Sequence, residues 1–373
     1  MPWLAVHLFH LSGTRVTYFE TGSGDTTLDY IQNLLFIVAA AVATIVWSAL
    51  DRRRKEYGTL RGWLGILLRL TLALTLFAYG FSKIVPLQFR PPNPLRLTET
   101  YGESSPMGLL WIFMGASMPY TIFSGLAEAF AAALLVFRRT ALLGALAAVA
   151  VLLNIVMLNF CYDVPVKLYS SNLLLMALFL LLPDVSRLAN VFLLNRTVPP
   201  ANLTVPRLPK RWMRVTANVA LPLLLVIFVA MGLRGHLFAL RSLEAGYTAP
   251  INGGFDVEAI QINGQPAAAV DPSNADWKQI FADKNHWLLR KTDGTSSYFS
   301  PTYRPKTNSV ELMSARTRST FDFDYSWTDA DHLVLKGKLG NETFVAHLQK
   351  IDEKKFLLTS RGFHWISEYP FNR

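Results

Sequence analysis

Residues 154–167, NIVMLNFCYDVPVK, form the stretch that decides the fold. The stretch begins inside an apolar run and ends in a polar corner, and a second apolar run, 168–183, follows it directly. Two hydrophobic helices joined by a tight, charged turn at 162–167, here called the elbow, explain this pattern. Polar side chains are unfavourable among lipid tails, because lipid offers them no hydrogen-bonding partner. The polar residues around the elbow are therefore the first candidates for function.

Further apolar runs lie on both sides of this stretch, and several reach the roughly 18 residues that can span a bilayer. We expect six spans, at 28–50, 62–85, 118–137, 140–161, 168–183 and 215–237. Only 17% of the residues are charged, against about 25% in soluble domains. The chain is thus predicted to be a polytopic membrane protein. The apolar piece 106–116 is too short to span and is expected to be re-entrant or interfacial.

The basic residues predict the orientation of these spans. Thirteen Lys and Arg residues lie in the three loops on one side, and three (Arg90, Arg96 and Lys167) lie in the loops on the other. Basic loops favour the cytoplasmic side, which explains the net charge of +10 without a nucleic-acid partner. Segment 1–27 lacks the basic start and long apolar core of a signal peptide. We expect it to be extracytoplasmic and to have lost an upstream part.

Residues 239–373 carry a different pattern. Aromatic and polar residues alternate in TFDFDYSW (320–327), as in a half-buried strand. FDVEAIQI (255–262), KKFLLTS (354–360) and the two runs around a hairpin turn at Gly340 and Asn341 fit the same pattern. We predict seven or eight strands in an antiparallel barrel or sandwich. The predicted division of the chain is 1–27, an outer segment; 28–61, the first span with its loop; 62–185, a helix bundle; 186–238, a loop with the sixth span; and 239–373, an outer β domain.

Four stretches between the second and fifth spans resemble the DoxX-like membrane family. They are YGFSKIVPLQF (79–89), SPMGLLWIFMGAS (105–117), YTIFSGLAEAFAAALLVFRRT (120–140) and NIVMLNFCYDVPVKLYSSNLLLMALFLLLPD (154–184). The resemblance implies a four-helix membrane bundle. Some relatives are subunits of a thiosulfate:quinone oxidoreductase, and others are linked to redox-stress complexes. The first span, the sixth span and the β domain depart from the minimal bundle, so the chain resembles a long form of the family.

Antiparallel spans bring several polar residues toward the outer half of the bundle. The candidates for a ligand site are Tyr79, Lys83, Glu128, Asn154, Asn159, Asp163 and Lys167. Glu128 lies near the middle of its span, where a carboxylate must be protonated, paired with a cation or facing water. Asn159 and Asp163 share a face if the helix continues past Cys161, while Asn154 shares another face with Cys161. The hypothesis is one polar pocket that opens toward the outer side.

A structural role for the same residues is the alternative. An Asn that bonds across a helix pair contributes about 0.6 kcal/mol on average, and Asp163 and Lys167 can simply pair across the elbow. Cys161 is the only cysteine, which excludes an intrachain disulfide and a cysteine metal cage. The seven histidines show no ligand spacing, so no metal site is predicted.

Two functions from different classes are consistent with this sequence. The first is a redox-linked membrane subunit that binds a quinone or another lipophilic molecule in its bundle, with Glu128 as the catalytic, proton-handling residue and its electron carrier on a protein partner. The second is a non-enzymatic membrane anchor whose outer β domain binds a protein, peptide or lipid. Whether the chain is an enzyme stays open between them. Both place the chain in a bacterial inner membrane, with the C-terminal domain on the periplasmic side.

Overall fold

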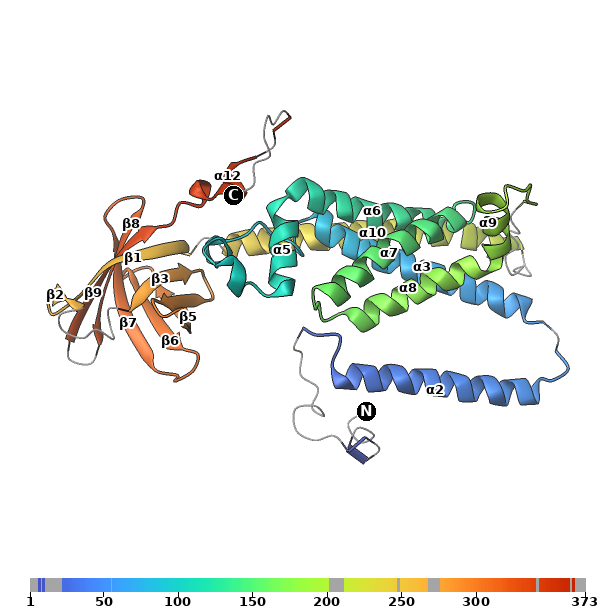
Figure 1. The fold of residues 1–373 in the computed structure, drawn as a ribbon, viewed down its shortest axis with the longest axis horizontal. Coiled ribbons are helices and arrows are strands. Elements are labelled where there is room, and N and C mark those ends of the chain that lie inside the picture. The colour runs from blue at the N-terminus through green and yellow to red at the C-terminus, as the bar shows by residue number, and fades with distance from the viewer. Residues whose placement is uncertain are drawn as a thin grey trace. The chain divides into compact units, whose positions relative to one another are not determined.

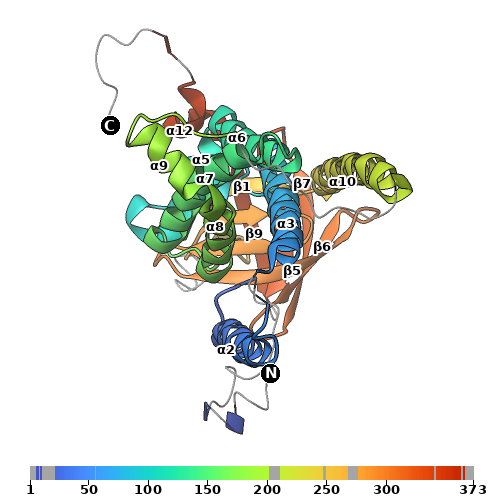
Figure 2. The same cartoon turned by 90° about the vertical axis from the view of Figure 1, so that its right-hand side faces the viewer.

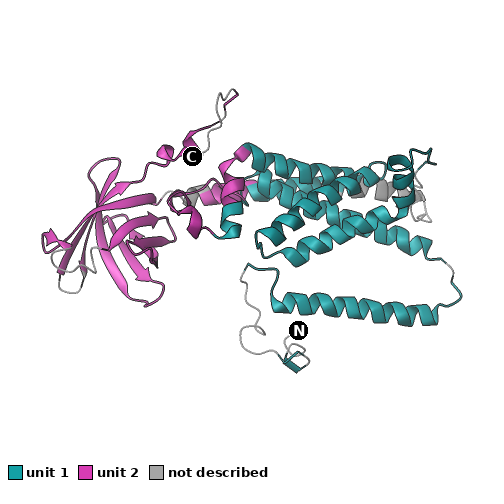
Figure 3. Ribbon diagram, in the orientation of Figure 1, with its two compact units in different colours: residues 1–88, 105–110, 119–236 teal, residues 89–104, 111–118, 237–373 magenta. Residues whose placement is uncertain are grey.

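A computed structural model describes residues 6, 7, 9, 10, 22–54, 56–200, 211–246, 249–267, 276–339, 342–362, 364 and 365. The chain divides into two compact units, shown in two colours in Figure 3. The helical unit comprises residues 1–88, 105–110 and 119–236, and the barrel unit comprises 89–104, 111–118 and 237–373. The barrel unit therefore takes in two segments, 89–104 and 111–118, that lie between predicted spans rather than in the C-terminal part of the chain.

Among the described residues, six helices are long and apolar enough to cross a membrane, as predicted. They are α2 (Thr27–Leu50), α3 (Gly58–Ile84), α6 (Met118–Val136), α7 (Ala141–Cys161), the stretch Lys167–Phe192 that begins with α8 (Lys167–Leu181), and Val226–Leu243 within α10 (Arg211–Gly246). The short helical elements are α4 (Pro94–Leu97), η2 (Tyr101–Glu103), α5 (Pro106–Ala116), η3 (Leu182–Asp184), α9 (Val185–Phe192), η5 (Glu353–Lys355) and α12 (Leu357–Ser360).

Four of the long helices, α3, α6, α7 and α8, pack together in both Figure 1 and Figure 2. They share one apolar core, in which leucines from α3, α6 and α7 surround small residues. Ala131 on α6 and Ala148 on α7 are fully buried. A side chain at Gly144 would place its Cβ 2.6 Å from the Leu135 backbone nitrogen, so α6 and α7 approach closely at this glycine. The predicted bundle is therefore present, and small residues allow its close packing.

Helix α2 makes few contacts through its side chains. It begins at a capping box, in which Thr26 accepts a hydrogen bond from the Asp29 backbone and Asp29 accepts one from the Thr26 backbone. Leu28 and Ile31 are buried near its start. Most of its remaining apolar side chains are exposed, which suits a helix that faces lipid rather than protein.

The C-terminal part of the chain forms a closed antiparallel β-barrel. Strand β1 pairs with both β3 and β9, and this double pairing closes a ring of eight of the described strands; within the described residues, β2 pairs with β1 alone. The strands are β1 (Gly253–Ile262), β2 (Gln265–Pro266), β3 (Trp277–Ala282), β4 (Trp287–Lys291), β5 (Ser296–Arg304), β6 (Ser309–Ser314), β7 (Thr320–Trp327), β8 (His332–Leu339) and β9 (Glu342–Lys350). Of the two predicted architectures, the barrel is the one observed.

Side chains fill the interior of this barrel. Phe323 and Tyr325 of β7 point into the core, while Asp322 and Asp324, which alternate with them, are exposed, as the sequence alternation predicts. The largest interior residues, Trp287, Phe255 and Phe344 with several leucines and isoleucines, are almost completely buried. The barrel is thus a packed core.

Of two further sequence predictions for this region, one is wrong and one concerns residues that the structure does not describe. The segment 354–360 was predicted as a strand, but it forms the end of η5 and the short helix α12. Its three apolar residues, 356–358, are consecutive and do not alternate, and Asp352 accepts a hydrogen bond from the Lys354 backbone at the first turn, which favours helical turns. The predicted turn at Gly340 and Asn341 lies outside the described residues, although Leu339 and Glu342 on either side do pair.

Candidate functional site

The helical unit contains a buried ion pair between two helices. Lys83 near the end of α3 donates a hydrogen bond to Oε1 of Glu128 on α6. Lys83 is 6% exposed and Glu128 is 2% exposed, so the protein buries both charged groups between the helices. The structure thus joins two of the residues that the sequence singled out, and the mid-span carboxylate is paired with a cation, one of its three predicted states.

Two glycines position this pair. A Cβ at Gly125 on α6 would lie 2.6 Å from the Gly80 carbonyl oxygen on α3 and 2.9 Å from the Lys83 Cβ. No side chain other than hydrogen fits between the helices at this level. The close approach of the two backbones brings the lysine within reach of the carboxylate one helical turn further along α6.

The two carboxylate oxygens of Glu128 differ in their hydrogen bonding, because Lys83 donates to Oε1 and not to Oε2. Oε2 is buried and, among the described residues, has no hydrogen-bond partner. A buried acceptor without a donor is rare and needs a reason. Chemically, this oxygen can carry a proton or accept a hydrogen bond from a molecule that enters the bundle.

The elbow between α7 and α8 holds a second group of polar residues. Helix α7 ends at Cys161, and Asp163 takes a positive φ of 51°, so the helix does not continue and Asn159 and Asp163 do not share a helical face. Asn159 is buried and donates a hydrogen bond to the Ser170 hydroxyl at 3.0 Å. Lys167 pairs with the exposed Asp163 at 2.7 Å. These contacts are those expected if the elbow residues have a structural role rather than a role in ligand binding.

Asp25 completes the elbow and was missed by the sequence analysis. Its two carboxylate oxygens accept hydrogen bonds from the backbone nitrogens of Lys167 and Leu168, at 2.8 Å and 2.9 Å. These are the first two N–H groups of α8, which have no partner within the helix itself. Asp25 therefore caps α8 from 142 positions away along the chain. The Gly24 nitrogen, which donates to the Pro165 carbonyl at 2.8 Å, fastens the same segment to the elbow.

Of the remaining candidates, Tyr79 on α3 is close enough to Glu128 to interact with its charge, whereas Asn154 is exposed. Asn154 and Cys161 are on the exposed side of α7. Tyr79 is half-exposed, and its ring lies 6.3 Å from that of Tyr169. Lys83 and Glu128 form one pair with Tyr79 nearby, the elbow residues form another group, and Asn154 is exposed. A single pocket that unites these residues stays a prediction.

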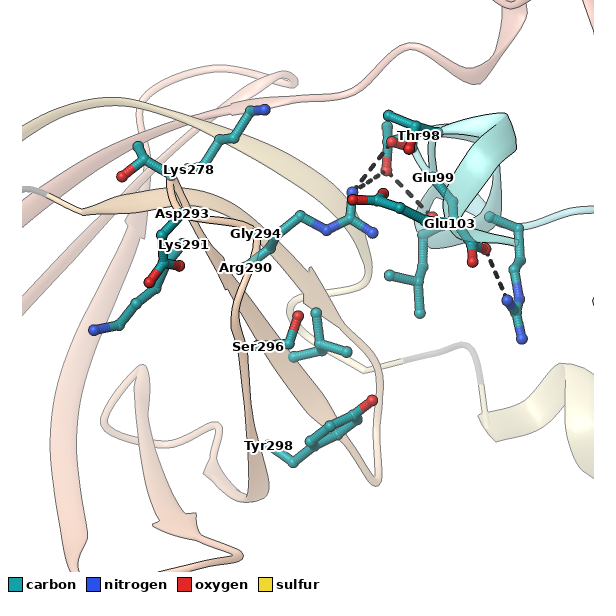
Figure 4. A pocket seen from close by; sticks show the side chains of 15 residues that line it. Thr98, Glu99, Glu103, Lys278, Arg290, Lys291, Asp293, Gly294, Ser296 and Tyr298 are labelled. Atoms are coloured by element: carbon teal, nitrogen blue, oxygen red, sulfur yellow. Dashed lines mark hydrogen bonds and ion pairs between the residues drawn. The ribbon is translucent and has the colours of Figure 1, made fainter. Parts of the chain in front are cut away.

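The barrel unit contains a pocket of about 520 Å³, which Figure 4 shows from close by. One wall is the segment 95–103, which carries α4 and η2, and the other is the outer face of β3, β4 and β5 with the turn after β4. Most lining residues are polar, with cations and carboxylates on both walls. The charged ones are Arg96, Glu99, Glu103, Lys278, Arg290, Lys291 and Asp293.

Arg290 fastens the two walls together. Its Nη1 donates to the Thr98 carbonyl at 3.2 Å, to the Thr98 hydroxyl at 3.1 Å and to Oε1 of Gln279 at 3.0 Å. Gln279 in turn donates to Asp256 at 2.9 Å. Beneath this chain of polar contacts, Leu95 packs on a small apolar cluster formed by Phe281, Leu288 and Ile351 on the outside of the barrel.

Two carboxylates of the pocket, Glu103 and Asp293, have lowered pKa values, which favours their charged form. A hydrogen bond from the Thr100 hydroxyl lowers the pKa of Glu103, and nearby Arg290 and Lys278 add to the effect. A hydrogen bond from Thr295 lowers the pKa of Asp293 in the same way. Arg96 pairs with Glu99 at 2.7 Å. In the part of the chain that the structure describes, Lys278 and Lys291 make no ion pair within 4.0 Å, so their ammonium groups are available to a ligand.

Metal ligands do not gather anywhere in the described ranges, since no three His, Cys, Asp or Glu residues there could hold an ion together. His332 pairs with Asp329 at 2.8 Å and His286 with Asp283 at 3.8 Å, each within one turn of the chain. The carboxylate of Asp329 raises the pKa of His332. These are exposed local pairs.

The fold and these sites define a class: a multi-pass membrane protein with a helix bundle and a closed β-barrel on one chain. The chain is 37% identical over 124 residues to the uncharacterized protein YwoB of Bacillus subtilis strain 168. The match covers 33% of this chain and 79% of that protein, so the chain belongs to the same family as YwoB. No family model matches the chain, and no solved structure matches it.

Proposed function

We propose that this protein is a membrane-anchored binding protein, in which the helices hold the barrel unit at the membrane and the charged pocket of that unit takes a polar ligand. The observation that carries this proposal is the pocket itself. A segment from between two helices is fastened by Arg290 and Leu95 to the outer face of the barrel. A charged cavity of about 520 Å³ lies between them.

The lining supports a polar ligand rather than a lipid tail. Its aliphatic side chains are Leu95 and Leu288, and the rest is polar, charged, glycine or the ring of Tyr298. Tyr298 is 60% exposed, so its ring can stack on a flat or cyclic group. The barrel interior is filled by its own side chains and leaves the outer face as the binding surface. A ligand with both charged and hydroxyl groups, such as a peptide or a sugar derivative, matches this lining.

Native mass spectrometry of the gently solubilised protein tests this binding. A double variant, Lys278→Glu with Tyr298→Ser, changes the pocket at two exposed side chains, and Lys336→Glu on β8 is a matched surface control outside the pocket. We expect a polar molecule to remain bound to the native chain and to the control, and to be lost from the double variant. Retention by the double variant, equal loss from the control, or a native chain with no bound polar molecule would contradict the proposal.

The same proposal places the barrel unit on the periplasmic side of a bacterial inner membrane. The support is the excess of Lys and Arg in the loops at the other end of the helices. Cysteine labelling tests it in a Cys161→Ser background, which has no other cysteine. An impermeant maleimide should label Asn285→Cys in intact spheroplasts, and label Glu56→Cys only after lysis. The reverse pattern would overturn this placement.

A redox-linked subunit is the second candidate, and the unpaired Oε2 of Glu128 favours it. The hydroxyl of a quinol, the reduced form of a quinone, could donate to this oxygen, and the resemblance to DoxX-like proteins, itself a proposal, points the same way. In this case Glu128 handles the proton, Lys83 holds the carboxylate, and a partner carries the electron carrier. Binding of decylubiquinol to the solubilised chain should be lost in Glu128→Gln and kept in Asn154→Ala, whose side chain is exposed. Equal binding by both variants would remove this candidate.

A further inference from the structure

Helix α9, Val185–Phe192, does not continue the line of α8, on which it follows. The 3-10 turn Leu182–Asp184, with Pro183 in it, separates the two helices. Figure 1 and Figure 2 both show α9 turned away from the direction of α8. By length and composition alone, the candidate span runs from Lys167 through α9 to Phe192, but a helix that turns away at Leu182–Asp184 need not cross the membrane with α8.

The turn comes where a span should end. Lys167–Asp184, at about 1.5 Å per residue, reaches roughly 27 Å, close to the ~30 Å thickness of the hydrocarbon core. An ion pair between Asp184 and Arg187 follows at this level. Charged groups of this kind belong among lipid headgroups rather than among acyl chains.

Contacts within the helical unit show which end this is. Asp25 bonds to the elbow at the start of α8, so α2 begins at the elbow end and finishes at the opposite end, at Arg52–Arg54 in sequence. The turn between α6 and α7, with Arg138 and Arg139, lies at that same opposite end because α7 runs from it to the elbow. Helix α9 therefore starts at the basic end of the bundle, where anionic headgroups are favoured.

The residues of α9 divide into two faces. At 100° per residue, Val185, Leu188, Ala189 and Phe192 fall on one side, and Ser186, Arg187 and Asn190 fall on the other. Leu188 packs against the bundle core. Phe192 is 72% exposed and Leu193, which follows it, is 81% exposed. An apolar face of this size, next to a polar one, is typical of helices that lie in a membrane interface.

We propose that α9 is an interfacial helix that lies in the headgroup layer at the basic end of the bundle and inserts Phe192 and Leu193 among the acyl chains. The occupant of the exposed part of its apolar face, Val185 and Phe192 with the following Leu193, is the lipid surface itself. Continuity with the span α8 supports this choice, because the helix starts at the level where the headgroups begin. The neighbouring arginines supply the charge that phosphate groups complement. The proposal is independent of the ligand of the barrel unit.

Spin labelling in lipid nanodiscs of phosphatidylglycerol and phosphatidylcholine tests this placement. Cys161→Ser is the background, and single cysteines at Phe192 and Ser186 report the two faces of α9; both native side chains are exposed, so the label need not disturb packing. Leu175→Cys, exposed on α8 and 61% accessible, gives the reference for a label in lipid. Collision with molecular oxygen reports lipid, and collision with the polar nickel complex NiEDDA reports water.

The label at 192 should collide with oxygen several-fold more than with NiEDDA, like the label at 175, while the label at 186 should show the opposite preference. A label at 192 that NiEDDA reaches as readily as it reaches 186 would show that α9 stands in water. A label at 192 that neither reagent reaches would show that protein covers this face. Either result overturns the proposal.

Discussion

At the scale of single residues, the pair formed by Lys83 and Glu128 shows how strongly a buried charge depends on its partner. Removing one member leaves the other buried and uncompensated, which costs about 3–5 kcal/mol. Lys83→Met should therefore lower the free energy of unfolding in detergent by this amount. Lys83→Met combined with Glu128→Leu should recover most of the loss, because two apolar side chains can replace a buried pair. A double variant that is less stable than the single one would contradict this account.

Tyr303 gives a pH dependence at the same scale. Its hydroxyl accepts a hydrogen bond from Trp287 Nε1 at 2.8 Å and lies 3.0 Å from the carbonyls of Ile251 and Asp283. Burial raises the pKa of Tyr303 to about 12, above the value of about 10 in an unfolded chain. The neutral phenol thus stabilises the fold fully below pH ~10, and this stabilisation is lost as the pH rises from ~10 to ~12.

The near-UV circular dichroism signal of the barrel aromatics should therefore melt at progressively lower temperature above pH ~10. Tyr303→Phe has no ionisable group at this position, so its melting temperature should change less over the same range. It should also be less stable at neutral pH, by about 1 kcal/mol, because Trp287 loses its acceptor. Parallel pH profiles for the two proteins would show that another group controls alkaline unfolding.

At the scale of elements, the start of α8 depends on a residue outside the helix. Asp25→Ala removes the acceptor for two backbone N–H groups and should destabilise the chain by about 1 kcal/mol, as loss of a helix cap does. Asp163→Ala is the control, because its ion pair with Lys167 is exposed and contributes at most about 1 kcal/mol, often nothing measurable. The melting temperature of Asp25→Ala in detergent should be lower than that of Asp163→Ala, and the reverse order would refute the capping role.

At the scale of the whole molecule, Arg290 connects two parts of the chain that are almost two hundred positions apart. Arg290→Ala should release the segment 94–104 from the outer face of the barrel, because it removes both bonds to Thr98. Hydrogen exchange followed by mass spectrometry should show faster exchange in this segment, with the barrel strands unchanged. Lys336→Ala, an exposed change on β8, should leave the segment as protected as in the native chain, and equal protection in Arg290→Ala would contradict the fastening role.

Residues of the bundle show how far prediction from sequence can reach. The spans followed from apolar runs of about 20 residues, because hydrophobicity adds up along a run whatever the packing. The sequence predicts three possible states for Glu128, namely protonated, paired with a cation or facing water. The buried ion pair with Lys83 shows that the second of these is present. The orientation of Asn154 could not be predicted, since in lipid both faces of a helix are apolar and periodicity does not show which one faces the protein.

The sequence by itself therefore determined the local features of this protein: where the helices span, where the strands alternate, and which end of the bundle is basic. These depend on neighbouring residues alone. Only the tertiary structure decided that Asp25 caps α8, that the segment 94–104 joins the barrel unit, and that the double pairing of β1 closes the barrel. Each of these is a contact between distant positions, and such contacts depend on how the whole chain packs.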